Sequence, residues 1–188
     1  MLFGILSKII DEEKLLKTGL FTHKETQLYL KMLENNFNVS QTSSMGRVLD
    51  AVSVLLGLVE KRTYEGRPAM LLESAATKPY TIEPEFSTKK GKHILLTTPL
   101  FEYLLENRKK DTGRLAATAQ TYLAKGIYDI AKKQAKQSKP IVASGGVCYN
   151  KMITSYLIKN KVFMHKQLPC GDGCISYGQT IIANMKNK

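Results

Sequence analysis

The chain has 188 residues, 43% of them hydrophobic, and a formal net charge of +12 at pH 7. This length and composition suffice for a hydrophobic core, so we expect a soluble globular protein of one domain or one large lobe. The apolar run in residues 1–10 is too short for a signal peptide, and residues 52–59 are too few to span a bilayer. Three cysteines leave an odd thiol if any two pair, which argues against a secreted disulfide framework. We therefore expect a cytoplasmic protein without membrane contact.

The excess of positive charge lies in the second part of the chain. Residues 1–107 hold 13 Lys or Arg and 13 Asp or Glu, whereas residues 108–188 hold 15 and 3. Such a lobe would attract nucleotide phosphates, nucleic acid or an acidic partner protein. We favour a plainer interpretation for the lysines near residues 132–139, as a solvated helix end that complements the helix dipole.

The apolar spacing predicts helices and strands in a definite order. Helices are expected at residues 5–17, 24–35, 45–56, 68–76, 99–108 and 114–137, and a strand hairpin is expected at residues 80–86 and 92–98. Two short apolar runs near Ile141 and Val162 then predict parallel strands, because a helical segment lies between them. The fold class is therefore α/β, with a small mixed sheet flanked by helices and a helical N-terminal region.

Two carboxylates in the first part are candidate ligand contacts. Asp50 lies among apolar neighbours on a predicted helix, so it needs a partner, either Arg47 one turn earlier or a ligand hydroxyl. Glu65 lies in the turn before the helix that begins near Pro68. It either caps that helix or faces a ligand.

A first glycine loop joins a predicted strand to a predicted helix. Ser144, Gly145 and Gly146 follow the apolar run at residues 141–143. Glycine allows close approach of a backbone to a ligand, and free N–H groups at a helix start attract anions, so a phosphate or nucleotide is the expected guest. The alternative is an ordinary connection between strand and helix.

A second glycine loop, residues 169–174, also leads into an apolar helical stretch. Asp172 lies between two glycines, where it is either a metal or hydroxyl ligand or, more commonly, a helix cap. Cys170 and Cys174, with Cys148 nearby, suggest zinc, but a fourth ligand is not evident. Small, partly buried side chains are the preferred interpretation of these cysteines.

Four ordered segments resemble motifs of the hydrogenase-maturation carbamoyltransferases, the HypF family. Residues 42–52 resemble TSSxGRxxDAV, and residues 64–73 resemble YEG…A…LE. Residues 144–150 resemble SGGVxxN, and residues 169–179 resemble PxxDGGIxxGQ. The resemblance covers essentially the whole chain and identifies residues 1–188 as a single C-terminal lobe, mainly helical in residues 1–60 and α/β in residues 61–188.

The resemblance implies an actin-like, ribonuclease H-like ATPase fold that uses ATP and carbamoyl phosphate. It implies a carbamoyl adenylate whose carbamoyl group passes to the C-terminal cysteine of a hydrogenase-maturation acceptor protein. By the same resemblance, Ser144, Gly145, Gly146 and Asn150 belong to the nucleotide loop, Asp172 binds a divalent metal, zinc or iron, and Asp50 and Glu65 lie near the ribose. Carbamoyl transfer develops charge on phosphate and carbonyl oxygens, which suits backbone N–H groups and a carboxylate-held metal.

The chain departs from the family pattern in ways that predict an incomplete site. The family's metal site also needs a His-x-x-x-His pair, and His23, His93 and His165 are not spaced to form one. Cys174 stands where the family's second glycine is expected. We therefore expect a missing or separately encoded N-terminal lobe, no complete catalytic set in this chain, and self-association through exposed apolar surface. The alternatives are an inactive remnant that binds nucleotide or a partner protein and, less favoured, a basic nucleic-acid-binding module.

Overall fold

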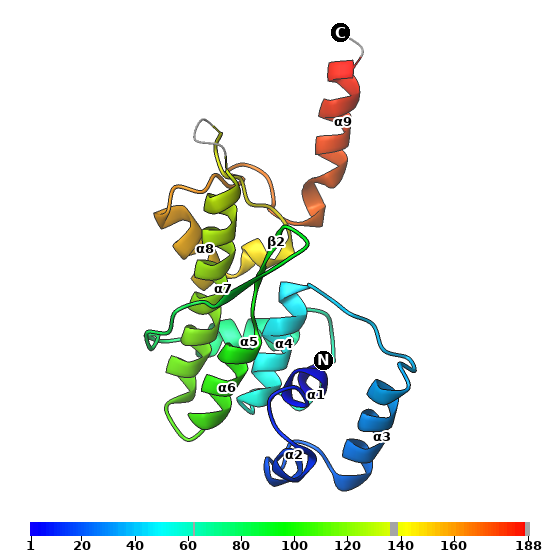
Figure 1. Ribbon diagram of the computed structural model, residues 1–188. Helices are drawn as coiled ribbons and strands as arrows, with labels where there is room; N and C mark the ends of the chain where they lie inside the picture. Colours follow the sequence, from blue (N-terminus) through cyan, green and yellow to red (C-terminus); the bar gives the residue numbers. More distant parts are fainter. Residues whose placement is uncertain (62, 136–138, 187–188) are drawn as a thin grey trace.

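The structure is a computed structural model that describes residues 1–61, 63–135 and 139–186. A long central helix, α7, runs through the molecule and contacts α4, α5, α6, α8 and the strand β2 (Figure 1). The elements in chain order are α1 Leu2–Leu6, α2 Glu12–Lys17, α3 His23–Glu34, α4 Met45–Leu55, α5 Arg67–Ala75, β1 Phe86–Lys89, β2 Lys92–Leu95, α6 Thr98–Glu106, α7 Thr112–Gln134, the 3-10 helix η1 Gly146–Tyr149, α8 Lys151–Lys159, the 3-10 helix η2 Asp172–Cys174 and α9 Ile175–Lys186.

The hydrophobic core is built around the N-terminal half of α7. Its fully buried alanines, Ala116, Ala117 and Ala119, present little side chain, so neighbouring helices can approach closely. Buried leucines, isoleucines and valines from α1, α4, α6 and α8 complete one continuous cluster. The amphipathic helices expected at α4, α6 and α8 are confirmed.

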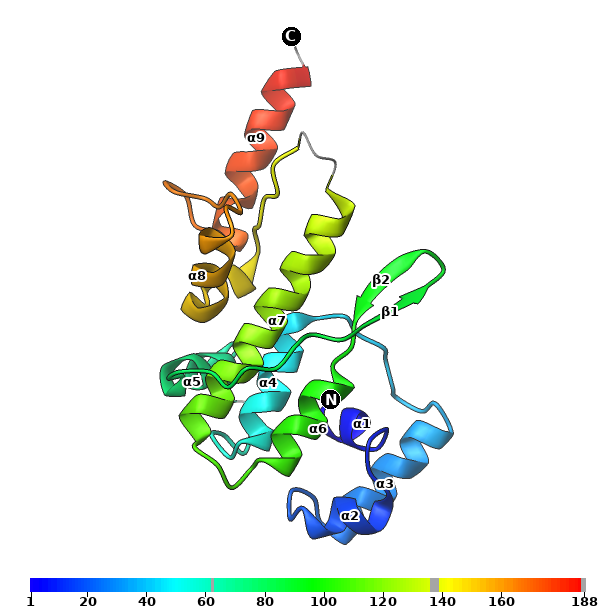
Figure 2. The ribbon, with the colours of Figure 1, turned by 60° about the vertical axis from the view of Figure 1, so that its left-hand side comes forward.

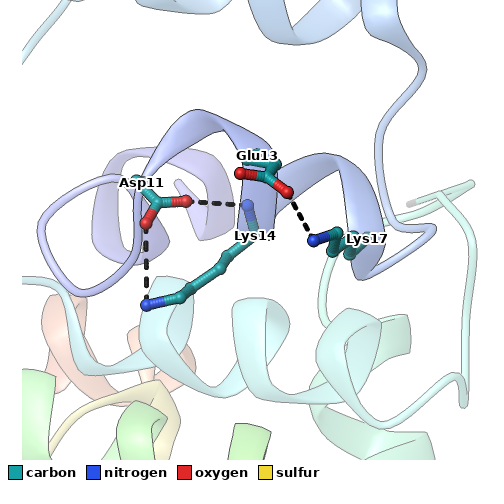
Figure 3. Close-up of polar contacts among 4 residues, drawn as sticks. All are labelled: Asp11, Glu13, Lys14 and Lys17. Atoms are coloured by element: carbon teal, nitrogen blue, oxygen red, sulfur yellow. Dashed lines mark hydrogen bonds and ion pairs between the residues drawn. The ribbon is translucent and has the colours of Figure 1, made fainter.

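The first predicted helix, residues 5–17, is two helices in the structure. Asp11 interrupts it because its carboxylate accepts a hydrogen bond of 2.8 Å from the Lys14 backbone N–H and so caps α2 (Figure 3). That hydrogen bond also holds the pKa of Asp11 below its ordinary value. Asp competes well for backbone donors at a helix start, whereas it is a poor residue for a helix interior. The continuous-helix prediction is therefore wrong at Asp11.

A hairpin forms where one was predicted, but its first strand begins at Phe86, where the predicted strand ends, and its second strand stops at Leu95 instead of residue 98. β1 and β2 pair antiparallel from Phe86 opposite Leu95 to Lys89 opposite Lys92. The turn residues Lys90 and Gly91 both have positive φ, at 51° and 73°, as a tight hairpin turn requires.

Residues 80–85, predicted as strand, are instead held by side chains of α7. The Tyr80 N–H donates to the Thr118 hydroxyl at 2.8 Å, and the Glu85 N–H donates to the Tyr122 hydroxyl at 3.0 Å. Because these backbone donors bond to a helix, the segment runs across α7 without forming a ladder with another strand.

The two later strands form a minimal parallel pair. Val142 and Phe163 make a parallel bridge, with hydrogen bonds from Ala143 N–H to the Phe163 carbonyl at 2.9 Å and from Phe163 N–H to the Ile141 carbonyl at 2.8 Å. The structure thus confirms a mixed α/β lobe, with its antiparallel and parallel pairs in separate places. The predicted end of the long helix, at residues 136–137, lies outside the described residues.

The last helix, α9, extends away from the rest of the molecule in both views (Figures 1 and 2). It contacts η2 at its start. Its apolar side chains are largely exposed, from 44% at Ile181 to 73% at Met185. None of the helices in the described parts of the chain is both long and apolar enough to cross a membrane.

Candidate functional site

The two glycine loops lie against each other at the ends of the parallel pair. The Gly145 N–H donates to the Cys170 carbonyl at 2.6 Å, and the Ser144 hydroxyl donates to the same carbonyl at 3.0 Å. Gly145 adopts φ +116°, a conformation that side-chain-bearing residues rarely adopt, so glycine is required there. The backbone pairing of the parallel strands therefore brings residues 144–146 and 169–174 to one edge.

A second contact fixes how closely the loops approach. The Gly171 N–H donates to the Tyr149 hydroxyl at 3.3 Å. A Cβ atom on Gly171 would lie 2.6 Å from the Tyr149 ring, so only glycine fits without displacing that ring. Tyr149 from the first loop and Gly171 from the second thus form one packed contact.

Asn150 is buried, and both ends of its amide are used within the chain. It is 6% exposed, its Oδ1 accepts from the Ile153 N–H at 3.1 Å, and its Nδ2 donates to Gln120 Oε1 at 2.7 Å. Gln120, fully buried on α7, donates in turn to the carbonyls of Leu72 and Ala116. Asn150 therefore caps α8 and ties it to α7, and its predicted nucleotide contact stays a prediction.

Glu73, to which the sequence assigned no role, also accepts a hydrogen bond at the start of α8. The Lys151 N–H donates to Glu73 Oε1 at 3.1 Å. Glu73 belongs to the YEG…A…LE segment, which is the only signal that marked it. Because Glu73 and Asn150 take the Lys151 and Ile153 donors, the start of α8 offers fewer free N–H groups to a phosphate. A four-residue 3-10 helix, η1, also separates the first glycine loop from α8.

Asp172 is exposed at the rim of the second loop. It begins η2 without making a capping hydrogen bond, and its carboxylate has no hydrogen-bond or ion-pair partner within the described residues. The capping role considered for Asp172 is therefore not realised, and its oxygens are accessible to a ligand.

The donor set for a metal ion is incomplete in the described parts of the chain. There, no three His, Cys, Asp or Glu side chains are arranged to hold an ion. Asp172 supplies at most one ligand, and structural and catalytic metal sites need three or four. We therefore derive no chemical step through a metal from this chain.

The two remaining candidates lie at other points of the lobe. Asp50 is half-buried on α4, a helix that contacts η1 and so lies near the first loop. Glu65 is exposed in the turn before α5, whose N-cap is Gly66 and has no side-chain cap. A shallow hollow of about 330 Å³ is lined by residues 57–61, Thr63 and Arg67, and Glu65 is not among its lining residues. A second hollow of about 510 Å³ lies where Glu73 meets Lys151, outside the edge formed by the two loops.

The lysines at the end of α7 are partly engaged with aromatic rings. Lys132 Nζ lies 5.9 Å from the centre of the Tyr128 ring, and Lys133 Nζ lies 5.0 Å from the centre of the Phe86 ring. Both lysines are in the last turn of the helix, where positive charge complements the dipole. This placement agrees with the solvated helix end favoured from the sequence.

The fold and the paired loops define a lobe of a Kae1-like ATPase-fold protein. A family model described as "Carbamoyltransferase, Kae1-like Domain, second subdomain" of HypF matches residues 1–179. The chain belongs to this family.

Relatives and solved structures agree with that assignment. A probable carbamoyltransferase HypF of Methanocaldococcus jannaschii is 38% identical over all of this chain and 26% of that relative, and the carbamoyltransferase HypF of Rhodobacter capsulatus is 28% identical over 89% of the chain and 23% of the relative. A crystal structure of full-length HypF in a phosphate- and nucleotide-bound form is 27% identical, covers 89% of this chain and 28% of that one, and has a TM-score of 0.78. The crystal structure of HypF from T. kodakarensis is 28% identical to this chain. It covers 97% of this chain and 26% of that one, with a TM-score of 0.76. The chain thus spans about a quarter of the length of these proteins.

Proposed function

We propose that this chain is the second lobe of a carbamoyl-transfer site of the HypF type, acting in [NiFe]-hydrogenase maturation. It binds ATP and the carbamoyl adenylate against Gly145 and Gly146, and a first lobe, separately encoded or missing from the given residues, supplies the rest of the site. The observation that carries the proposal is the hydrogen bond from the Gly145 N–H to the Cys170 carbonyl, which joins the two loops at one edge.

The chemistry of this edge suits a nucleotide phosphate. Gly145 and Gly146 offer backbone without side chains, and the excess of positive charge in residues 108–188 attracts anions. The family match and the nucleotide-bound relative support ATP as the guest. The recipient of the carbamoyl group is the C-terminal cysteine of a hydrogenase-maturation acceptor protein.

Asp172 is proposed as this lobe's one ligand to a divalent zinc or iron ion. Its exposed carboxylate without a partner in the described chain supports this role. Asp50 and Glu65 are proposed to approach the ribose from α4 and from the turn before α5. Ser144 and Asn150 are proposed to shape the nucleotide loop, Ser144 through its bond to the Cys170 carbonyl and Asn150 by fixing α8.

The test is calorimetry of ATP binding to the full chain, alone and with a polypeptide that carries the first subdomain, with zinc present. We expect binding in the mixture, weakened about tenfold or more by Asp172→Asn, since a lost metal ligand costs charge stabilisation. Glu12→Gln changes an exposed carboxylate on α2 and is the matched control, expected to bind normally. Absence of ATP binding in both arms would sink the proposal. Binding without carbamoyl transfer in the mixture would favour the remnant that only binds nucleotide.

A further inference from the structure

The last helix, α9, carries its larger apolar side chains on one half of its circumference, if a helix turns by about 100° per residue. This half is the apolar face of α9. Its members are all exposed, and they are Ile175, Tyr177, Ile181, Ile182 and Met185. Ser176, Gln179 and Thr180 lie on the other half. An apolar stripe on one side of a helix is typical of a helix that packs against another surface.

The apolar face of α9 is uncovered within the described residues. α9 contacts η2 at its start and extends away from the rest of the molecule in both views (Figures 1 and 2). The helix has 12 residues, and isolated helices shorter than about 12–15 residues are marginal in water. Most of the stability of such a helix comes from packing its apolar face. A surface that covers α9 is therefore expected.

A second copy of this chain is a poor cover for the apolar face of α9. Two helices of this length pack along a strip of about 18 Å by 10 Å, or roughly 180 Å². A standard interface between two proteins buries about 800 Å² on each partner. Pairing of α9 with another α9 therefore falls far short of what a stable dimer needs.

The start of α9 lies at the edge where the site is incomplete. η2 runs directly into α9, since the C-cap of η2 is Ile175. The loop that contains η2 is joined to the first loop by the hydrogen bond from the Gly145 N–H to the Cys170 carbonyl. In the described residues this edge does not bring together three metal-binding side chains, and the matching family model is that of a second subdomain. A first subdomain that completes the edge therefore also reaches α9.

We infer that the apolar face of α9 is the docking surface for the first subdomain, which receives it in an apolar groove. This inference rests on the proposed function, which supplies the first subdomain. Ile175 and Ile182 lie seven positions apart and Met185 lies three further on, which is the anchor spacing of a helix that binds in a groove. The two loops and α9 then form one continuous interface, and the contact at α9 holds the first subdomain against the nucleotide edge.

The docking surface is tested by calorimetry of the full chain with a polypeptide that carries the first subdomain, without ATP or metal. Ile182→Glu should weaken the association by about tenfold or more, because it places a carboxylate where an apolar side chain is buried. Gln179→Glu introduces the same side chain on the other half of α9 and is the matched control, expected to associate as the wild type does. Hydrogen exchange of the α9 amides should slow by about tenfold or more when the first subdomain is added.

Three results would overturn the inference. The first is no association of the two lobes, and the second is equal affinity of the wild type and Ile182→Glu. The third is a dimer of the chain alone that Ile182→Glu dissociates in sedimentation velocity, because the face would then belong to a second copy. Failure of the proposed function is distinguishable, since lobes that associate through α9 but bind no ATP would contradict that proposal alone.

Discussion

Replacing Asn150 tests whether this motif residue acts through the fold. Asn150→Ala removes the cap of α8, which costs about 1 kcal/mol. It also leaves the fully buried Gln120 Oε1 without its donor, which costs about 1–3 kcal/mol. The free energy of unfolding should therefore fall by roughly 2–4 kcal/mol, and the melting temperature by roughly 5–15 °C for a chain of this size.

Asn150→Ser separates the two contributions. A serine hydroxyl still accepts from the Ile153 N–H, but it is too short to reach Gln120, so only the loss of about 1–3 kcal/mol remains. Asn184→Ala, at an exposed position of α9, is the matched control and should change stability by less than about 0.5 kcal/mol.

The measurement is urea unfolding followed by far-ultraviolet circular dichroism, with ATP calorimetry on the same variants. A loss below about 0.5 kcal/mol in Asn150→Ala would refute the reasoning, because the buried amide would then carry little energy. Full stability combined with lost ATP affinity would instead make Asn150 a direct ligand of the nucleotide.

Three further predictions follow from close packing and burial. Gly126→Ala should lower the free energy of unfolding in urea by about 1–3 kcal/mol, because its Cβ would lie 2.4 Å from the side chain of Leu95 on β2. The control Gly178→Ala, with nothing within 4 Å of its Cβ, should raise that free energy by up to about 1 kcal/mol through helix propensity. Equal effects of the two substitutions would contradict the close packing at Gly126. Gly171→Ala should disturb the contact with Tyr149 and speed amide hydrogen exchange in both loops by about tenfold, which corresponds to about 1.4 kcal/mol. Gly173→Ala is the control and should leave the exchange rates unchanged, because its Cβ would make only an ordinary contact of 3.5 Å with Pro169. Burial raises the pKa of Tyr122, so the folded state keeps this proton longer than the unfolded chain and stability falls as pH rises above about 10. Tyr122→Phe should lower stability at neutral pH and flatten that alkaline decline; an unchanged pH profile would refute the assignment.

Periodic patterns in the sequence predicted the elements whose structure depends on near neighbours. The helices at α3 to α8 and the hairpin bear this out, since amphipathic spacing and turn residues act within a few positions. Asp11 was missed as a break, although an aspartate followed by two acidic residues is a local helix-start signal that the apolar spacing outweighed.

Contacts between distant residues account for what the sequence did not show. Residues 80–85 alternate as a strand should, but their backbone donors bond to Thr118 and Tyr122, about 37 positions later. Likewise Glu73 closes the start of α8 across 78 positions. Such pairings depend on how the helices pack, which local patterns do not encode.

Motif membership alone does not separate ligand contacts from structural support. Asn150 and Asp172 were both assigned to the site by the same kind of resemblance, yet one is 6% exposed with its amide bonded at both ends, and the other is exposed with no partner in the described chain. A buried amide stays fixed because leaving its partners unpaired is costly, whereas an exposed carboxylate gains energy only when a cation arrives. Substitution at Asn150 should therefore change stability first, and substitution at Asp172 should change ligand binding while stability stays the same. Of the two residues, Asp172 is the one from which direct chemistry is expected.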